Sequence, residues 1–260
     1  MYEKLKDLPE EIDLDSCYFY HTMELPGYGT IEGHWDLRGS EDVYLGPAEF
    51  DGRPAFDVGP GTGYLSFEMA RRGARVIALE WDERAQSDFG LIPYSDYESH
   101  FKVSYPQKID ERRANILALR NSFLLAQRAL RTEIPIYTGD VVRTAPPLEA
   151  DVAFLGCILL HLRDPVGAIY NIARGVREAI VITDLTCDMP TSFDGPPAAL
   201  FLPSKTDGGN VGTWWYLSPA ALRQILTVVG FNRFELSVGS IFSNQEKRNA
   251  EIFNITAWRQ

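Results

Sequence analysis

Asp57-Val58-Gly59-Pro60-Gly61-Thr62-Gly63-Tyr64 is the stretch of this chain that decides its fold. The short apolar run from Pro54 to Val58 predicts a buried strand before it, and the segment from Tyr64 to Arg72 predicts a helix that ends at Gly73. Three alternating glycines therefore fall where a strand turns into a helix. Glycine permits positive φ there and lets a ligand approach the backbone closely, while the N–H groups that open the helix can face a polar group.

A second predicted strand, Arg75 to Leu79, ends on Glu80, 19 residues after Gly61. A carboxylate at that place can accept hydrogen bonds from both hydroxyls of a ribose, and such an acid indicates nucleoside binding in Rossmann-like sheets. The glycine spacing differs from the dinucleotide pattern G-x-G-x-x-G, because the glycines stand at 59, 61 and 63 and Asp57 precedes them. The chain thus resembles the class I S-adenosylmethionine (SAM)-dependent methyltransferases in their first motif.

This resemblance, which extends over roughly residues 50–258, implies SAM as cofactor and S-adenosylhomocysteine (SAH) as its product. Ile134 to Tyr137 is expected to be a strand that leads to Gly139-Asp140-Val141, similar to the family's adenine-contacting acidic loop. The alternative for Asp140 is an ordinary turn aspartate. The cofactor-binding residues that the resemblance implies are Asp57, Gly59, Pro60, Gly61, Gly63, Glu80, Trp81, Asp140, Val141 and Gly156.

Strands and helices alternate along the rest of the chain, which predicts an α/β fold. We expect a Rossmann-like, doubly wound sheet of seven strands with the last strand antiparallel and the ligand at the carboxyl ends of the strands. The nearly unbroken apolar run Asp151–Leu160 predicts a central parallel strand covered on both faces. The other expected elements are helices over 111–131, from Asp164-Pro165 and from Ser218-Pro219, and strands over 179–184, 231–236 and 251–258, the last two as antiparallel neighbours.

Three regions fall outside this alternation and are expected to shape the substrate site. Residues 1–50 are interpreted as an N-terminal extension or lid, and residues 51–260 as one methyltransferase domain with inserts near 85–110 and 186–216. Aromatic side chains with polar tips suit a lid over a cofactor, although the same residues could simply pack onto the core. The first insert, with Tyr94, Tyr97 and His100, could form a further wall. The expected substrate-contacting residues are Tyr20, His21, Trp35, Arg38, Trp214 and Trp215.

The segments Phe154–Pro165 and Thr213–Pro219 resemble a branch of the class I methyltransferases that includes the bacterial tRNA wobble-uridine enzymes. The carboxymethyl-transferring enzymes of that branch have a tyrosine before the histidine, whereas this chain has Leu160 before His161, which favours ordinary methyl transfer. His161 is expected at a strand end beside the cofactor, as a general base or as a residue that positions the methionyl carboxylate. His34 and Asp184 are the other candidate catalytic residues, and no cluster has the spacing of metal ligands.

Composition limits the partners of this 260-residue chain, whose net charge is −11. Because phosphate contacts normally demand a basic surface, a nucleic-acid substrate is disfavoured. Three cysteines argue against a disulfide framework, and no signal peptide or membrane-length apolar segment is visible, so a cytoplasmic location without a membrane partner is expected.

The preferred hypothesis is methyl transfer to oxygen, nitrogen or carbon of a small metabolite. The alternatives are tRNA wobble-uridine modification and non-catalytic SAM binding; no oligomeric state is assigned.

Overall fold

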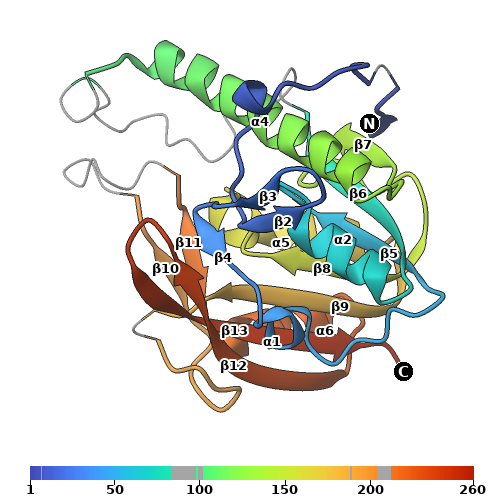
Figure 1. Ribbon diagram of the computed structural model, residues 1–260. Helices are drawn as coiled ribbons and strands as arrows, with labels where there is room; N and C mark the ends of the chain where they lie inside the picture. The colour runs from blue at the N-terminus through green and yellow to red at the C-terminus, as the bar shows by residue number, and fades with distance from the viewer. Residues whose placement is uncertain (7, 83–97, 99–101, 188, 204–211) are drawn as a thin grey trace.

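A single large sheet forms the centre of the molecule (Figure 1). The computed structural model describes residues 1–6, 8–82, 98, 102–187, 189–203 and 212–260. In this part of the chain, nine strands form the sheet in the order β1-β7-β6-β5-β8-β9-β13-β12-β4. Its members are β1 (Glu3–Lys4), β4 (Trp35–Asp36), β5 (Pro54–Val58), β6 (Arg75–Trp81), β7 (Ile136–Gly139), β8 (Ala150–Gly156), β9 (Val176–Leu185), β12 (Arg233–Ser243) and β13 (Arg248–Trp258).

The directions of the strands make the sheet mixed. The five neighbours β7, β6, β5, β8 and β9 pair in parallel, so their carboxyl ends share one edge of the sheet. β13 runs antiparallel to both β9 and β12, which confirms that the last two strands are antiparallel neighbours. Two small antiparallel sheets lie outside, β2 (Met23–Leu25) with β3 (Gly29–Ile31) and β10 (Ala199–Phe201) with β11 (Trp215–Leu217).

The described sheet has two strands more than the seven expected, because the N-terminal extension contributes to both edges. β1 pairs with β7 at one edge, and β4 pairs with β12 at the other. Each of these strands is two residues long. Hydrophobic alternation needs at least four residues to be recognised, so a strand this short leaves no pattern in the sequence. Residues 1–50 are thus built into the sheet as well as lying over it.

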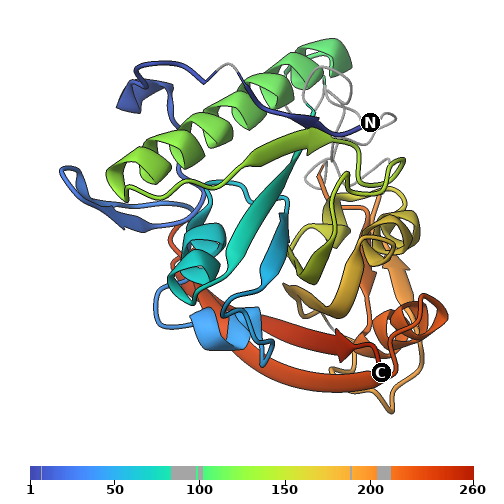
Figure 2. The same ribbon diagram turned by 90° about the vertical axis from the view of Figure 1, so that its right-hand side faces the viewer.

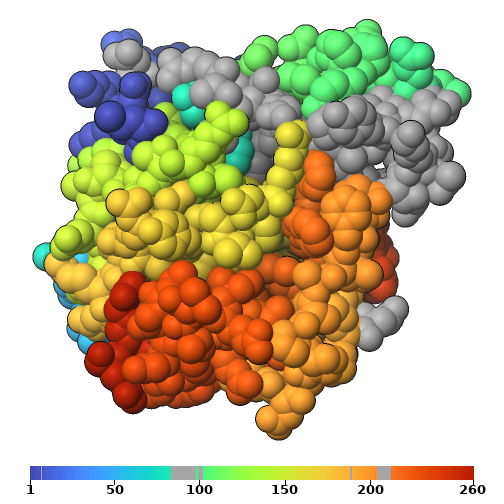
Figure 3. All heavy atoms as spheres, turned by 180° about the vertical axis from the view of Figure 1, so that it is seen from behind, coloured from blue at the N-terminus to red at the C-terminus, as the bar shows by residue number. Residues whose placement is uncertain are grey.

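Helices cover both faces of the sheet, as Figure 2 shows. On one face lie α1 (Glu41–Leu45), α2 (Tyr64–Arg71) and α4 (Tyr105–Ala129), and on the other lie α5 (Pro165–Ala173) and α6 (Pro219–Val228). The second face is the one that Figure 3 presents, with α5 in yellow and α6 in orange. The observed strands alternate with helices on both sides, which confirms a Rossmann-like α/β arrangement.

α4 begins six residues before the expected start at Glu111, because a capping box precedes the regular apolar spacing. The Ser104 side chain accepts a hydrogen bond from the Gln107 N–H, and the Gln107 side chain accepts one from the Ser104 N–H at 2.8 Å. These bonds satisfy backbone groups that a helix start otherwise leaves unpaired. The helix therefore extends past the carboxyl edge of the sheet, where its first turns can contribute to a site.

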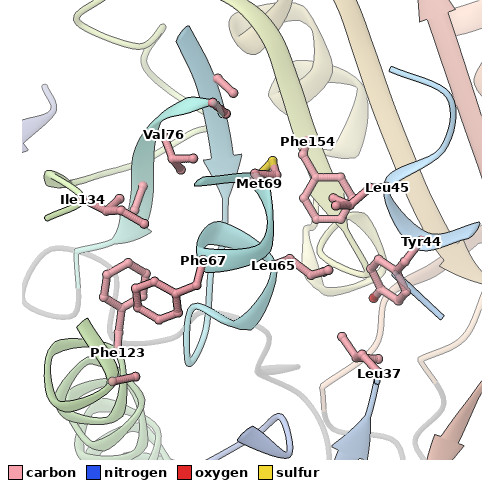
Figure 4. Packing of buried hydrophobic residues seen from close by; sticks show 14 of the residues in the cluster. Leu37, Tyr44, Leu45, Leu65, Phe67, Met69, Val76, Phe123, Ile134 and Phe154 are labelled. Carbon is pink, nitrogen blue, oxygen red and sulfur yellow. The ribbon is translucent and has the colours of Figure 1, made fainter. Parts of the chain in front are cut away.

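Two hydrophobic clusters fill the space between the sheet and its helices. Successive side chains of β8 belong to different clusters. Val152 and Phe154 pack in the cluster under α2 and α4, whereas Ala153 and Leu155 pack in the cluster under α5 and α6. Figure 4 shows the first cluster, in which the rings of Phe67 and Phe123 pack with their centroids 5.1 Å apart. A strand buried on both faces explains the uninterrupted apolar sequence.

The strand predicted over Asp151–Leu160 ends earlier than expected, at Gly156. Cys157 has φ +47°, and a 3₁₀ turn follows at Leu159–His161, so the chain leaves the sheet before the apolar run ends. Leu159 and Leu160 are nevertheless buried. Apolar character indicates burial and does not indicate backbone conformation, which is why the run is longer than the strand.

Of the insert near 85–110, Tyr94, Tyr97 and His100 lie outside the described residues.

Candidate functional site

The glycine-rich turn forms an elbow between β5 and α2. Gly59, Gly61 and Gly63 have φ values of +73°, +56° and +82°, a backbone region that residues with a Cβ rarely adopt. A Cβ at Gly63 would also lie 2.5 Å from the Phe123 ring, whereas a Cβ at Gly61 would meet only the His21 ring, at 3.7 Å. Gly63 is therefore needed for packing, while Gly61 keeps the space beside it open.

A cavity of about 420 Å³ lies at the carboxyl ends of the parallel strands. Its walls come from the ends of β5, β6, β7, β8 and β9, from one face of α4 and from the N-terminal extension. In Figure 1 this edge of the sheet lies beneath the first half of α4 and beside β4 and β11. The position agrees with the general rule that ligands of open α/β sheets bind outside the carboxyl ends of the strands.

The cavity brings together ten of the residues expected at the site. They are Gly59, Gly61, Glu80, Trp81, Val141, Gly156, Tyr20, His21, Trp35 and His161. Nine others do not line it: Asp57, Pro60, Gly63, Asp140, His34, Asp184, Arg38, Trp214 and Trp215.

The buried carboxyl group of Asp57 supports the elbow from behind. Asp57 is 2% exposed and accepts a hydrogen bond from the Ser66 hydroxyl in the first turns of α2, at 2.5 Å. The pKa of Asp57 is raised to about 7, mainly by burial; the Ser66 hydrogen bond opposes the shift, and the nearby Glu80 adds to it. This acid therefore ties β5 to α2 and fixes the glycines between them.

Glu80 and Asp140 stand at the ends of neighbouring strands but differ in their surroundings. Glu80 lines the cavity, and its carboxylate accepts a hydrogen bond from the Trp81 N–H at 2.7 Å. The Asp140 carboxylate accepts the Val142 N–H at 2.8 Å and forms an ion pair with Arg143. Asp140 thus stabilises its own turn, which matches the alternative that the sequence left open for it.

The N-terminal extension covers the cavity through aromatic side chains that hold one another. The Trp35 Nε1–H donates to the Tyr20 hydroxyl at 2.9 Å, and the Tyr20 and His21 rings meet edge to face with centroids 5.1 Å apart. His21 Nδ1 lies 3.0 Å from the hydroxyl of Thr62 within the elbow. Burial lowers the pKa of His21 to about 4, with His34 adding to the effect. The extension is therefore anchored on the elbow by a neutral histidine.

His161 lies in the 3₁₀ turn after β8 and lines the cavity. Its Nδ1 lies 2.5 Å from the Gly212 carbonyl oxygen. A carbonyl can only accept, so Nδ1 carries the proton and the lone pair is on Nε2. Burial lowers the pKa of His161 to about 4, although the Gly212 hydrogen bond opposes the shift. The imidazole is thus neutral at ordinary pH and keeps a basic nitrogen.

The other expected catalytic residues are outside the cavity for different reasons. His34 stacks on the outer side of Trp35, with ring centroids 4.9 Å apart, and lines a separate surface groove with Tyr18 and Asn244. Asp184 is buried near the end of β9, where its carboxylate accepts the Leu185 N–H at 2.9 Å. Burial raises the pKa of Asp184 to about 7.

Arg38, Trp214 and Trp215 also make contacts away from the cavity. Arg38 forms a two-pronged ion pair with Asp36. Trp214 carries the Arg163 guanidinium over its ring at 5.1 Å, and the Trp215 Nε1–H donates to the Arg163 carbonyl at 3.2 Å. Thr213, directly before them, does line the cavity. The sequence does not determine whether Thr213 or one of the two tryptophans faces the cavity, because that depends on how the segment crosses the edge of the sheet.

Several lining residues were not identified from the sequence. Arg112, Asn115, Ile116 and Leu119 form one face of α4, at the i, i+3, i+4, i+7 spacing. That spacing was available as a signal, but the helix was expected to start at Glu111 and to pack on the sheet. The other missed lining residues are Tyr2, Tyr44, Cys157, Ile158, Leu160, Thr213, Leu185 and Ile241, with the strand residues Val58 and Leu79. Tyr18, Leu37 and Gly139 also line the cavity and belong to segments that were expected there.

A hydrogen-bonded pair of polar side chains, Tyr44 and Cys157, forms part of the cavity wall. The Tyr44 hydroxyl donates to Cys157 Sγ at 3.1 Å. Burial raises the pKa of the Cys157 thiol, and the nearby Asp184 adds to that effect, so the sulfur is a protonated thiol. The left-handed backbone of Cys157 is a conformation that costs energy for a residue with a Cβ and is typical of functional regions.

The described residues include neither a helix that could cross a membrane nor a cluster of metal-ligating side chains. None of the helices in the described ranges is long and apolar enough to cross a membrane. Within the same residues, no group of three or more His, Cys, Asp and Glu side chains is arranged to hold a metal ion.

Comparisons with known proteins extend over the sequence and the fold. No protein-family model matches the chain. The ribosomal RNA small subunit methyltransferase A of Sphingopyxis alaskensis is 55% identical over 38 residues, which are 15% of this chain and only 14% of that protein.

Solved structures match most of the chain at low sequence identity. The N-terminal domain of EvdMO1, crystallised in the presence of SAH and D-fucose, has a TM-score of 0.51 and 16% identity, over 94% of this chain and 91% of that chain. The Burkholderia thailandensis 1,6-didemethyltoxoflavin-N1-methyltransferase, with bound 1,6-didemethyltoxoflavin and SAH, has a TM-score of 0.50 and 14% identity, over 86% and 78%. The chain therefore has a Rossmann-like fold that it shares with SAM-dependent methyltransferases.

Proposed function

We propose that the protein is a SAM-dependent methyltransferase that transfers a methyl group to a small-molecule acceptor. The observation that carries this proposal is the convergence of a glycine elbow, a strand-end carboxylate and an aromatic cover on one cavity. Gly59, Gly61 and Glu80 line that cavity together with Tyr20 and Trp35. An apolar pocket with a few polar groups at the carboxyl edge of such a sheet is the usual form of a nucleoside-binding site.

The residues present fit the cofactor. At Gly61 the space that a Cβ would take is open, with only the His21 ring at 3.7 Å, so a ligand can approach the backbone there. Glu80 supplies the acceptor for the ribose hydroxyls, and Leu79 and Val141 give apolar surface for a base. Asp140 acts here through its turn, which holds Val141 at the cavity; a direct contact between its carboxylate and the adenine amino group stays a prediction.

The chain's own contribution to the chemistry is alignment and removal of a proton. SAM, when bound, supplies a methyl group already activated by its sulfonium. The protein then has to hold an acceptor atom in line and accept its proton when the acceptor is a hydroxyl or an amine. His161 is the first candidate for that base, because it lines the cavity as a neutral imidazole with Nδ1 bonded to Gly212. His34 and Asp184 lie outside the cavity lining and become weaker candidates.

The size and lining of the cavity favour a small acceptor with an aromatic ring. Tyr18, Tyr20 and Trp35 close it from the side of the N-terminal extension. The alternative acceptor is RNA, for which the short similarity to a ribosomal RNA methyltransferase is the supporting observation. The net charge of −11 opposes it, because phosphate backbones bind to basic surfaces. Retention of tRNA at low salt and its release at higher salt would favour that alternative.

Calorimetry with SAH, SAM and NAD tests the proposal. We expect the two sulfur nucleosides to bind and NAD to bind more weakly. Glu80→Gln should weaken SAH binding at least about tenfold, since a hydrogen bond to a charged group contributes about 1.5–3 kcal/mol. Glu24→Gln is the matched control, because Glu24 is an exposed strand residue outside the cavity. If neither SAH nor SAM bound, or NAD bound more tightly, the proposal would be wrong.

Methyl transfer itself separates an enzyme from a non-catalytic SAM-binding protein. Labelled SAM incubated with the protein and fractionated metabolite pools should give labelled product in at least one pool. A protein that binds SAH yet labels nothing in such a screen, with RNA included as a substrate, would instead be a binding protein. Leu160→Tyr is a useful companion variant, because it installs the residue that precedes the histidine in the carboxymethyl-transferring enzymes.

A further inference from the structure

The two ends of the cavity differ in charge. At one end Tyr2 lines the wall, and after burial the two acids that most raise its pKa are Asp140 and Glu80. That end is therefore acidic, and it contains the carboxylate proposed to hold the ribose. A ligand with an adenosine part can place its sugar hydroxyls there as donors.

The other end contains a cation that the proposed function does not use. Arg112 lines the cavity from α4. Burial raises the pKa values of Tyr18 and Tyr20 and lowers that of His161; the positive charge of Arg112 opposes the rise at the two tyrosines and adds to the fall at His161. The guanidinium therefore shares the cavity with the two tyrosines of the cover and with the candidate base, and its charge acts on all three. This is the end at which an acceptor would meet His161.

The register of α4 explains why this arginine faces inward and its neighbour does not. Asn115, Ile116 and Leu119 follow Arg112 along the lining face of the helix. Arg113 points away: it does not line the cavity, its side chain is 42% exposed, and it pairs with Asp110 at 3.1 Å. The capping box at Ser104 makes the first turns of α4 helical, and this fixes the direction of Arg112.

We propose that Arg112 selects a carboxylate-bearing acceptor by pairing its guanidinium with the acceptor's carboxylate at the end of the cavity that contains His161. This inference rests on the proposed function. A guanidinium can bind a carboxylate through two parallel N–H···O bonds, which fixes both the position and the orientation of the bound molecule. The surrounding lining is largely apolar, and a charge pair is stronger there than in water.

The charge of the whole protein makes a local cation necessary for such a ligand. At a net charge of −11 the molecule as a whole repels anions. An anionic acceptor would therefore be retained only by a specific partner within the cavity, and among the described lining residues Arg112 is the one permanently cationic side chain. Neutral and cationic ring compounds would gain nothing from it. The carboxylate anchors the acceptor, and the ring lies against Tyr18, Tyr20 and Trp35.

Three ring compounds of similar size test this inference on the SAH-saturated protein: 2-naphthoate, 2-naphthylmethanol and 2-naphthylmethylamine. Binding is measured by NMR titration. We expect the wild type to bind 2-naphthoate at least about tenfold more tightly than the alcohol or the amine, as a charge-assisted bidentate pair should give. Arg112→Met should remove the preference while SAH affinity stays within about twofold of wild type. Arg113→Met is the matched control and should keep the preference, and Arg112→Lys should keep part of it.

Each contrary outcome has a distinct meaning. Equal binding of the three compounds by wild type, a preference that survives Arg112→Met, or no binding of any compound would overturn the inference. Loss of SAH affinity in Arg112→Met and Arg112→Lys, with circular dichroism unchanged, would assign the guanidinium to the cofactor's carboxylate and would overturn it too. Failure of the wild type to bind SAH at all would instead contradict the proposed function, which keeps the two tests separate.

Discussion

Alanine substitutions at three glycines separate the packing role of the elbow from its ligand-binding role. Gly52, Gly61 and Gly63 all have positive φ, so each substitution carries the same backbone strain. They differ in what the new Cβ would meet: nothing within 4 Å at Gly52, the His21 ring at 3.7 Å at Gly61, and the Phe123 ring at 2.5 Å at Gly63. Gly52→Ala therefore measures strain alone.

The magnitudes follow from these distances. The left-handed conformation costs a residue with a Cβ about 1–2 kcal/mol, and the stiffer unfolded chain returns about 0.4–1 kcal/mol. Gly52→Ala and Gly61→Ala should thus lower the free energy of unfolding by about 1 kcal/mol. Gly63→Ala adds the cost of forcing a methyl group into a packed aromatic cluster, about 1–3 kcal/mol, for a total of about 2–4 kcal/mol. Gly61→Ala should instead weaken SAH binding, because its methyl group enters the cavity.

Urea denaturation and calorimetry with SAH provide the two measurements. The free energies of unfolding should rank wild type above Gly52→Ala and Gly61→Ala, with Gly63→Ala lowest. SAH affinity should be normal in Gly52→Ala and lowered at least about fivefold in Gly61→Ala, a change of about 1 kcal/mol at the lower limit for overpacking. If Gly63→Ala were as stable as Gly52→Ala, or if Gly61→Ala bound SAH normally, the roles assigned to the elbow glycines would be refuted.

Two further predictions concern titratable groups. His161→Ala should lower the rate of methyl transfer at least about 100-fold. Because neutral imidazole is the active form and the pKa of His161 is about 4, the wild-type rate should fall only as the pH drops through about 4. A fall in rate near pH 6.5 would contradict the lowered pKa. Asp184 has its pKa raised to about 7, so its protonated form stabilises the fold at low pH and that contribution is lost as pH rises from about 4 to 7. Urea denaturation should therefore show that the free energy of unfolding of Asp184→Asn increases relative to that of wild type as the pH rises over this range. A difference between the two proteins that does not change with pH would count against the prediction.

Much of the fold follows from the sequence because the signals are local. The strand at Pro54–Val58, the glycine turn and the helix from Tyr64 depend on neighbouring residues only, and all three form where expected. The apolar run of β8 predicted a strand buried on both faces, which is confirmed by its burial. Glu80 could be placed at the cavity because parallel strands end at one edge, a property of the fold class rather than of this chain.

Long-range packing decided the rest. β1 and β4 are strands only because distant edges offer them partners, and two residues carry no periodic signal. The sequence predicted a role for His161, but the carbonyl that fixes its tautomer belongs to Gly212, 51 residues away, and the burial that keeps it neutral depends on tertiary packing. Arg112 and Arg113 are adjacent and alike in sequence. Only the register of α4 turns one toward the cavity and the other toward solvent, because a helix rotates by about 100° per residue.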